Sequence, residues 1–296
     1  MTSTTSSPIR RRSFGKWFAD TGWRHLVAIV VSLFAIFPLL YVFSASLNPK
    51  GTLTGSNQLF SAVGIDSYVR ILSDPKNPYG MWFLNTLVIA VVTGLVTVFI
   101  GACAAYAFSR MRFTGRRVGL VTIVVVQMFP QLLAVVAIFL LMSTLGDWFP
   151  AIGLNTHTGL ILVYLGGALG VNTYLMYGFF NTIPKELDEA ARIDGAGHAR
   201  IFFTIILRLV APILAVVGLL SFIGTVNEYV VASVVLIDPE KQTLVVGLTK
   251  LVSNPRYADW SAFSAGAVMA AIPVMILFLF LQKYIVGGLT AGATKG

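Results

Sequence analysis

Long apolar stretches alternate with short polar segments along the 296 residues of the chain. Six of these stretches reach the roughly 20 residues that a helix needs to cross a bilayer. They lie near residues 26–47, 81–108, 118–142, 159–180, 209–237 and 263–286. The pattern predicts an all-α, polytopic membrane protein with six transmembrane helices. Kinks are expected at the prolines in or beside the stretches, which are Pro38, Pro130, Pro212 and Pro273.

Composition and charge strengthen this interpretation. Hydrophobic residues make up 56% of the chain and charged residues 11%, a balance too apolar for a soluble protein of this length. Fifteen of the 21 Lys and Arg residues fall in 1–25, 109–117, 181–208 and the residues after 282. The positive-inside rule therefore makes both termini and the 181–208 loop cytoplasmic. The net charge of +9 is then explained by the orientation of the chain in the membrane. The sequence leaves no compact soluble domain that could bind nucleic acid.

The first 25 residues are expected to form a cytoplasmic segment that contains a short interfacial helix. Phe14, Trp17 and Phe18 follow helical spacing beside basic residues, which is typical of a helix lying on headgroups. An alternative is a twin-arginine export signal around residues 11–16. The apolar run that follows is long for a signal peptide, so a retained first span is favoured.

The 181–208 loop contains a polar, charge-balanced island. Pro184 can begin a helix without losing a hydrogen bond, and three acidic residues in the first turn suit the positive end of the helix dipole. Leu187, Ala190 and Ala191 form a narrow stripe of helical spacing that could lie closely against another surface, and Gly195 would stop the helix. A helix resting on lipid headgroups is the alternative, against which the acidic face argues.

Glu189, Ala190, Ala191 and Gly195, followed by an Ile-x-Leu, resemble the cytoplasmic signature of the membrane subunits of bacterial ABC importers. The resemblance implies that this helix is the coupling helix, which docks into a groove on an ATPase subunit. The family pattern continues with proline where this chain has Arg208, so the usual helix break is in doubt or moves to Pro212. The residues that the resemblance assigns to coupling are Glu186, Glu189, Ala190, Ala191, Asp194 and Gly195.

Residues 155–159, 164–167 and 288–296 are similar to the corresponding segments of maltose/maltodextrin importer permeases. This resemblance implies a transmembrane domain over 26–287 and a cytoplasmic tail over 288–296 that reaches between two ATPase subunits. The implied tail contacts are Leu289, Thr290 and Lys295. It also implies that an outer loop meets the solute-binding protein, for which the candidate residues are Asn254, Arg256, Tyr257 and Trp260. An aromatic belt at the outer membrane interface is the alternative explanation of that loop.

Polar residues inside the apolar stretches are costly unless they face protein or water. Gln127 and Gln131 flank Pro130, and Asn227 and Glu228 lie in the outer part of the fifth stretch. Two interpretations stay open for these four residues. They either line a transport pathway or form hydrogen bonds between helices.

The chain shows no catalytic chemistry of its own. It lacks the G-x-x-x-x-G-K-[ST] phosphate loop, its three histidines have no metal-ligand spacing, and its single cysteine excludes an intrachain disulfide. We therefore expect a transport subunit without a catalytic residue, metal or cofactor. By the resemblance, ATP and Mg²⁺ bind a separate ATPase.

The expected function is half of the translocation pathway of a sugar importer in a bacterial cytoplasmic membrane. By the resemblance, the partners are a homologous second permease, an ATPase homodimer and an external solute-binding protein. The sugar would be maltose, maltodextrin, trehalose or a related α-glucoside. The alternative is a secondary transporter driven by an ion gradient. That class predicts inverted repeats and a buried carboxylate cluster, whereas these stretches carry Glu228 alone.

Overall fold

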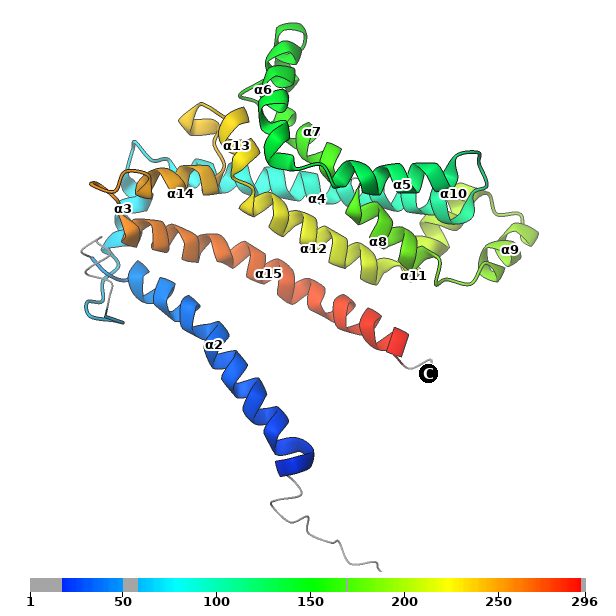
Figure 1. Ribbon diagram of the computed structural model, residues 1–296, viewed down its shortest axis with the longest axis horizontal. Helices are drawn as coiled ribbons and strands as arrows, with labels where there is room; N and C mark the ends of the chain where they lie inside the picture. The colour runs from blue at the N-terminus through cyan, green and yellow to red at the C-terminus, as the bar shows by residue number, and fades with distance from the viewer. Residues whose placement is uncertain (1–17, 50–57, 169, 294–296) are drawn as a thin grey trace, which may run out of the picture.

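A computed structural model of the chain describes residues 18–49, 58–168 and 170–293 (Figure 1). Every regular element within these ranges is a helix, so the predicted all-α class is confirmed. Three helices run side by side through the body of the molecule, namely α4 (Tyr79–Arg110), α12 (Ala211–Asn227) and α15 (Trp260–Ala293). Helix α12 packs against both of the others.

Small residues bring α4 and α12 close together. A Cβ added at Gly94 of α4 would lie 3.7 Å from the carbonyl oxygen of Gly218 on α12, which is ordinary van der Waals contact. Because apolar surface gives no net drive for association inside lipid, close packing of small residues is a main source of helix–helix affinity there. The α4–α12 pair is therefore the structural centre of the chain.

Further helices cover the remaining side of α4. Helices α7 (His157–Ala168) and α8 (Val171–Phe180) pack on α4, and α5 (Arg116–Gln127) packs on α8. Helix α6 (Gln131–Trp148) instead points away from the body. Helix α2 (Trp23–Ser46) packs against α15 and diverges from it along its length, and its buried residues are confined to the last three.

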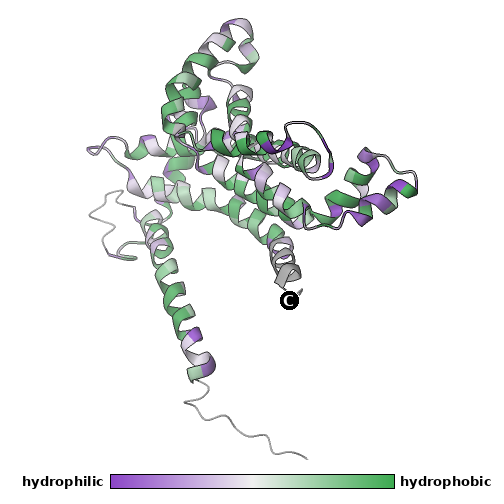
Figure 2. Cartoon of the chain, turned by 45° about the vertical axis from the view of Figure 1, so that its right-hand side comes forward, coloured by the Kyte–Doolittle hydropathy of each residue, from purple (hydrophilic) through white to green (hydrophobic). Residues whose placement is uncertain are grey.

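Short elements lie at the two ends of this bundle. One end carries α3 (Asp66–Ser73), η3 (Pro150–Ile152), α13 (Val230–Val235), η5 (Pro239–Lys241) and α14 (Leu244–Val252). The other carries α9 (Glu186–Ile193), α10 (His198–Arg200), η4 (Ile201–Ile206) and α11 (Leu207–Leu209). Polar residues gather on α9 and the connections, and apolar residues dominate the long helices between the ends (Figure 2).

Three described helices are long and apolar enough to cross a membrane alone, at 18–46, 79–110 and 260–284. Three bent pairs pass the same test together, which gives up to six spans if each pair is one span. The bends are 99° between α5 and α6, 52° between α7 and α8, and 78° before α12. The predicted stretches 118–142, 159–180 and 209–237 are thus apolar as expected but are not continuous helices.

Proline chemistry explains two of these breaks. Pro130 precedes α6 with an extended ψ of 113°, and Pro212 occupies the first turn of α12, where its missing N–H costs nothing. The kinks expected at these prolines are therefore present, and the break that Arg208 put in doubt does fall beside Pro212. Helices α2 and α15 continue through Pro38 and Pro273 without interruption.

The structure describes the predicted terminal segments only in part. Phe14 and Trp17 lie outside the described residues, and the π-helical turn η1 (Phe18–Gly22) runs directly into α2. At the other end, α15 continues beyond 287, so the backbone of the predicted tail is helical as far as Ala293. Lys295 lies outside the described residues.

Candidate coupling segment and pathway cavity

Helix α9 forms where the sequence predicts it. It runs from Glu186 to Ile193 with three acidic residues in its first turn. Gly195 follows with φ of 79°, in the left-handed region that favours glycine. The N–H of Gly195 bonds to the carbonyl of Arg192 at 2.9 Å, and that of Ala196 to the carbonyl of Ala191 at 2.9 Å. These bonds close the C-terminus as a glycine cap does.

A buried ion pair fastens α9 to the last turn of α4. Arg110 Nε lies 2.6 Å from Asp188 Oδ2, and the two side chains are only 2% and 5% exposed. Arg110 Nη2 also donates to the carbonyl of Ile183 at 2.9 Å, just before α9. Ser109 Oγ donates to Asn181 Oδ1 at 3.2 Å. Because stripping a buried charge of its partner costs about 3–5 kcal/mol, α9 is held firmly to α4.

Apolar packing completes this attachment. Ala191 of α9 and Ile183 join a buried cluster with Tyr106 of α4 and Phe202 of η4, whose rings lie 5.0 Å apart. The aromatic pair adds about 1 kcal/mol to the burial of its surface. A movement of α9 therefore carries the end of α4 with it.

The residues expected to meet an ATPase divide between two environments. Glu186, Glu189, Ala190, Asp194 and Gly195 are exposed. Ala191 is buried in the chain's own core, because it follows Asp188 by three residues and shares its inward face. Ile193 is 87% exposed beside Ala190 and Glu186, so an apolar residue absent from the predicted set dominates the outward face.

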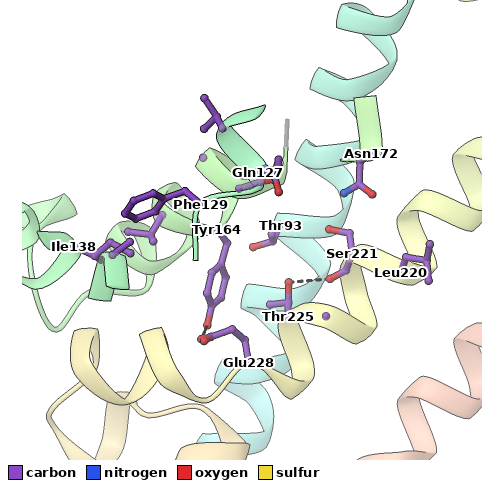
Figure 3. A pocket seen from close by; sticks show the side chains of 16 residues that line it. Thr93, Gln127, Phe129, Ile138, Tyr164, Asn172, Leu220, Ser221, Thr225 and Glu228 are labelled. Carbon is purple, nitrogen blue, oxygen red and sulfur yellow. Dashed lines mark hydrogen bonds between the residues drawn. The ribbon is translucent and has the colours of Figure 1, made fainter. Parts of the chain in front are cut away.

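A cavity of about 570 Å³ with a mixed polar and apolar lining lies beside the α5–α6 and α7–α8 breaks and the C-terminal half of α12 (Figure 3). Helices α4, α5, α7, α8 and α12 all contribute side chains to it. Its polar lining consists of Thr93, Gln127, Tyr164, Asn172, Ser221, Thr225 and Glu228. Irregular backbone at membrane depth is tolerated only where it is buried in protein or lines a water-filled space. The cavity supplies that setting.

Glu228 is held by three hydrogen bonds at the end of α12. Tyr164 Oη donates to its Oε2 at 2.7 Å, and the N–H groups of Val231 and Ala232 donate to its carboxylate at 2.8 and 2.9 Å. The backbone contacts satisfy free N–H groups at the start of α13, which explains why the predicted stretch to 237 breaks here. Glu228 thus lines the cavity and also forms a hydrogen bond between helices, and its role in a transport pathway stays a prediction.

Gln127 joins two further breaks. It is the last residue of α5, and its Nε2 donates to the carbonyl of Gly167 on α7 at 2.6 Å. A Cβ added at Gly170 would lie 2.0 Å from Gln127 Cγ, so a larger residue at the α7–α8 bend would have to displace this side chain. The α5–α6 and α7–α8 bends therefore meet at one residue.

The four predicted pathway residues are not all in the cavity. Gln127 and Glu228 line it, whereas Asn227 is exposed and donates to the carbonyl of Ile223 in its own helix at 2.9 Å. The side chain of Gln131 lies outside the described part of the structure. Sequence reasoning missed a signal here, because Ser221, Thr225 and Glu228 follow the i, i+4, i+7 spacing of one face of α12.

Comparison with known proteins identifies the family. The family described as "Binding-protein-dependent transport system inner membrane component" matches residues 97–290. The galactooligosaccharides permease GanQ of Bacillus subtilis is 40% identical over 92% of this chain and 94% of its own. The chain belongs to this permease family. It is therefore a membrane subunit of an ABC transport system and not an enzyme, as predicted.

Other relatives of the permease agree. The maltodextrin permease MdxG of Bacillus subtilis is 39% identical, with 92% of this chain and 95% of the relative covered. The maltose/maltodextrin permease MalG of Escherichia coli is 38% identical over the same shares. A bacterial ABC transporter involved in the import of the acidic polysaccharide alginate has a solved structure with a TM-score of 0.72. It is 29% identical, and 94% of this chain and 99% of the other are covered.

The permease presents the predicted outer loop at the end opposite α9. Asn254, Arg256 and Tyr257 are exposed, and Asn254 Oδ1 accepts the N–H of Arg256 at 3.0 Å. Trp260 is partly buried and packs edge-to-face on Phe263 at 6.0 Å. Trp260 is therefore fixed by its own helix, and the three loop residues before it remain accessible.

Proposed function

We propose that the chain is one of two permease halves of an ATP-driven oligosaccharide importer. In this proposal it crosses the bacterial cytoplasmic membrane six times, with each bent pair as one span and both termini cytoplasmic. The count of up to six spans and the bias of Lys and Arg toward one side support that topology. ATP and Mg²⁺ bind the ATPase homodimer, and this chain transmits the movement of that dimer to the translocation pathway.

One observation carries the proposal, namely that a single helix joins the two sites. Helix α4 holds Arg110, the anchor of α9, and also Thr93, which lines the cavity. Arg110 follows Thr93 by 17 positions, which corresponds to about 25 Å of helix and to most of the apolar thickness of a bilayer. Closure of the ATPase dimer would move α9, tilt α4 and α12, and open the cavity to the opposite side of the membrane.

The partner surfaces follow from the same arrangement. The outward face of α9, with Glu186, Ala190 and Ile193, meets the ATPase, and the tail with Leu289, Thr290 and Lys295 reaches the same dimer. The second permease faces the open side of the cavity and the projecting helix α6. The solute-binding protein meets Asn254, Arg256 and Tyr257, with Trp260 as their support.

The cavity favours a neutral oligosaccharide. Its lining holds hydroxyl and amide groups with one carboxylate, and it includes no Lys or Arg among the described residues. Such groups exchange hydrogen bonds with sugar hydroxyls, whereas an anionic sugar calls for cations. Maltodextrins and galactooligosaccharides, the substrates in the names of the relatives, are both neutral.

The test is co-purification of the permease with its partner permease, ATPase and binding protein, followed by reconstitution into vesicles. Neutral α-glucosides and galactosides should stimulate ATP hydrolysis and uptake, whereas an alginate oligosaccharide should not. Gln127→Ala should lower uptake several-fold, and Asn227→Ala is the matched control outside the cavity. Uptake driven by an ion gradient without ATP would contradict the proposal, as would equal uptake by the two variants.

A further inference from the structure

A second cavity, of about 520 Å³ and lined mainly by polar and charged residues, lies at the α9 end of the permease. It is bordered by the end of α4, the start of α5, one side of α9 and His198 of α10. The charged residues that decide its character are Arg112, Arg116, Lys185, Arg192 and Glu189. It is separate from the pathway cavity, with which it shares no lining residue.

The charges in this second cavity do not cancel. Arg110 and Asp188, which also line it, neutralise one another. Four cations then face the single carboxylate of Glu189, and none of the four lies within 4.0 Å of a carboxylate in the described part of the chain. Gathering like charges is costly unless an anion offsets them. The cavity therefore has the charge of an anion-binding site.

One of the four cations is already oriented. The guanidinium of Arg116 lies 5.9 Å from the ring centroid of Tyr177, and its Nη2 donates to Tyr177 Oη at 3.4 Å. Stacking on an aromatic ring restricts the guanidinium without neutralising its charge. A planar guanidinium held in this way can present two N–H groups to the oxygens of a phosphate.

The position of this cavity selects the kind of anion. Helix α4 ends at Arg110 and α5 begins at Arg116, so the cavity lies where two predicted spans meet the membrane surface. Basic pockets between helices on the cytoplasmic side match the headgroups of acidic phospholipids. A lipid phosphodiester can reach this level from the inner leaflet without leaving the bilayer.

The cavity also leaves the outward face of α9 free. Lys185, Glu189 and Arg192 follow one stripe of helical spacing, and Glu186, Ala190 and Ile193 follow the next. The two stripes are about 100° apart around the helix. One side of α9 can therefore contact a ligand in the cavity while the other contacts a protein.

We propose that this cavity binds a phosphate-bearing anion, namely the headgroup of an acidic phospholipid of the inner leaflet. Arg112, Lys185 and Arg192 contact the phosphate oxygens together with the guanidinium of Arg116, which Tyr177 orients. The bound headgroup would set how firmly α9 lies against α4. Only the cytoplasmic placement of α9 is taken from the proposed function.

The test uses the purified full importer complex in nanodiscs of phosphatidylcholine, with or without an equal share of phosphatidylglycerol. Phospholipid retained by the complex is measured by native mass spectrometry without ATP or sugar. The triple variant Arg112→Gln, Lys185→Gln, Arg192→Gln is compared with Arg117→Gln, Arg200→Gln, whose exposed arginines lie outside the cavity lining. Each removed cation should weaken phosphatidylglycerol binding about fivefold, and the triple change on the order of 100-fold.

Single Arg112→Gln and Lys185→Gln variants guard against misfolding of the triple variant, since each should show its own fivefold loss. Equal phosphatidylglycerol binding by the cavity and control variants would overturn the proposal. Added pyrophosphate distinguishes a soluble source of phosphate. Binding of pyrophosphate with no preference for phosphatidylglycerol over phosphatidylcholine would overturn the lipid assignment. Because the readout needs neither sugar nor ATP, its failure would leave the transport function untouched.

Discussion

Two arginine–aspartate pairs, one at each end of the permease, show how differently the ends are held. At the α9 end, Arg110 and Asp188 meet at 2.6 Å with side chains 2% and 5% exposed. At the other end, Arg70 and Asp259 meet at 2.9 Å with side chains 43% and 28% exposed. Desolvation makes the first pair costly to break, whereas water and salt screen the second.

The exposed pair matters less because neutral hydrogen bonds hold its end of the molecule. Trp82 Nε1 donates to the carbonyl of Pro239 at 2.7 Å, and Asn85 Nδ2 donates to the carbonyl of Glu240 at 2.8 Å. Thr86 Oγ1 accepts the buried N–H of Leu244 at 2.7 Å. Three side chains within about one turn of α4 thus fix the α13–α14 connection.

The difference shows that α4 is attached to its neighbours in different ways at its two ends. Several neutral hydrogen bonds hold the α13–α14 connection, so the loss of one leaves the others in place. At α9 one buried charged pair is the main polar attachment, supported by the bond from Arg110 to the carbonyl of Ile183 and by the apolar packing of Ala191. We infer that the first arrangement suits a rigid rim and the second suits a segment that must move as a unit with α4.

The largest expected effect is at the buried pair. Asp188→Ala should destabilise the permease by about 3–5 kcal/mol, because Arg110 would stay buried without a partner. Thermal unfolding of the detergent-solubilised permease and sugar-stimulated ATP hydrolysis should both report the loss. Replacing the pair together, Arg110→Met with Asp188→Leu, should recover stability but not coupling. If the single variant is as stable as the double variant, the pair does not hold α9.

A smaller effect is expected in the neutral network. Thr86→Val keeps the side-chain shape but removes the acceptor of the buried Leu244 N–H, which should cost about 1–3 kcal/mol. Thr249→Val is the matched control, since that hydroxyl donates only to the carbonyl of Val245 in its own helix at 2.7 Å. Thermal unfolding of the two variants should differ. If Thr86→Val lowered the stability as much as Asp188→Ala does, this would contradict the interpretation that several hydrogen bonds together hold this end.

The sequence predicts the helices compared here better than it predicts how they are attached to one another. Apolar stretches and the acidic turn of α9 are local patterns, and both were found where expected. The sequence puts Glu186, Asp188 and Glu189 in one turn without saying which faces α4, because that depends on tertiary packing. Likewise Pro130 predicts a kink but not one of 99°, and the contact of Tyr164 with Glu228 joins residues that are 64 positions apart in the sequence.

The exposed pair should contribute much less. Arg70→Ala should cost about 0–1 kcal/mol, and the cost should shrink further at high salt. Asp259 would still cap α15, since its Oδ1 accepts the N–H of Ala262 at 2.9 Å. Thermal unfolding at low and high ionic strength measures the effect. A loss of 3 kcal/mol or more that salt does not change would mean that the two ends are held alike.

The smallest effect on stability is expected in the loop beside this exposed pair. Replacing residues 254–258 by a Gly/Ser segment of equal length leaves Asp259, its contact with Arg70 and its cap of α15 in place, so thermal unfolding should not change. Stimulation of ATP hydrolysis by the sugar-loaded binding protein should nevertheless fall, because Asn254, Arg256 and Tyr257 are the exposed groups that the replacement removes. Basal ATP hydrolysis is the control and should stay constant. Unchanged stimulation would show that the loop does not contact the binding protein, whereas a drop in unfolding temperature would show that the loop supports the end of the molecule that carries α3 and α14.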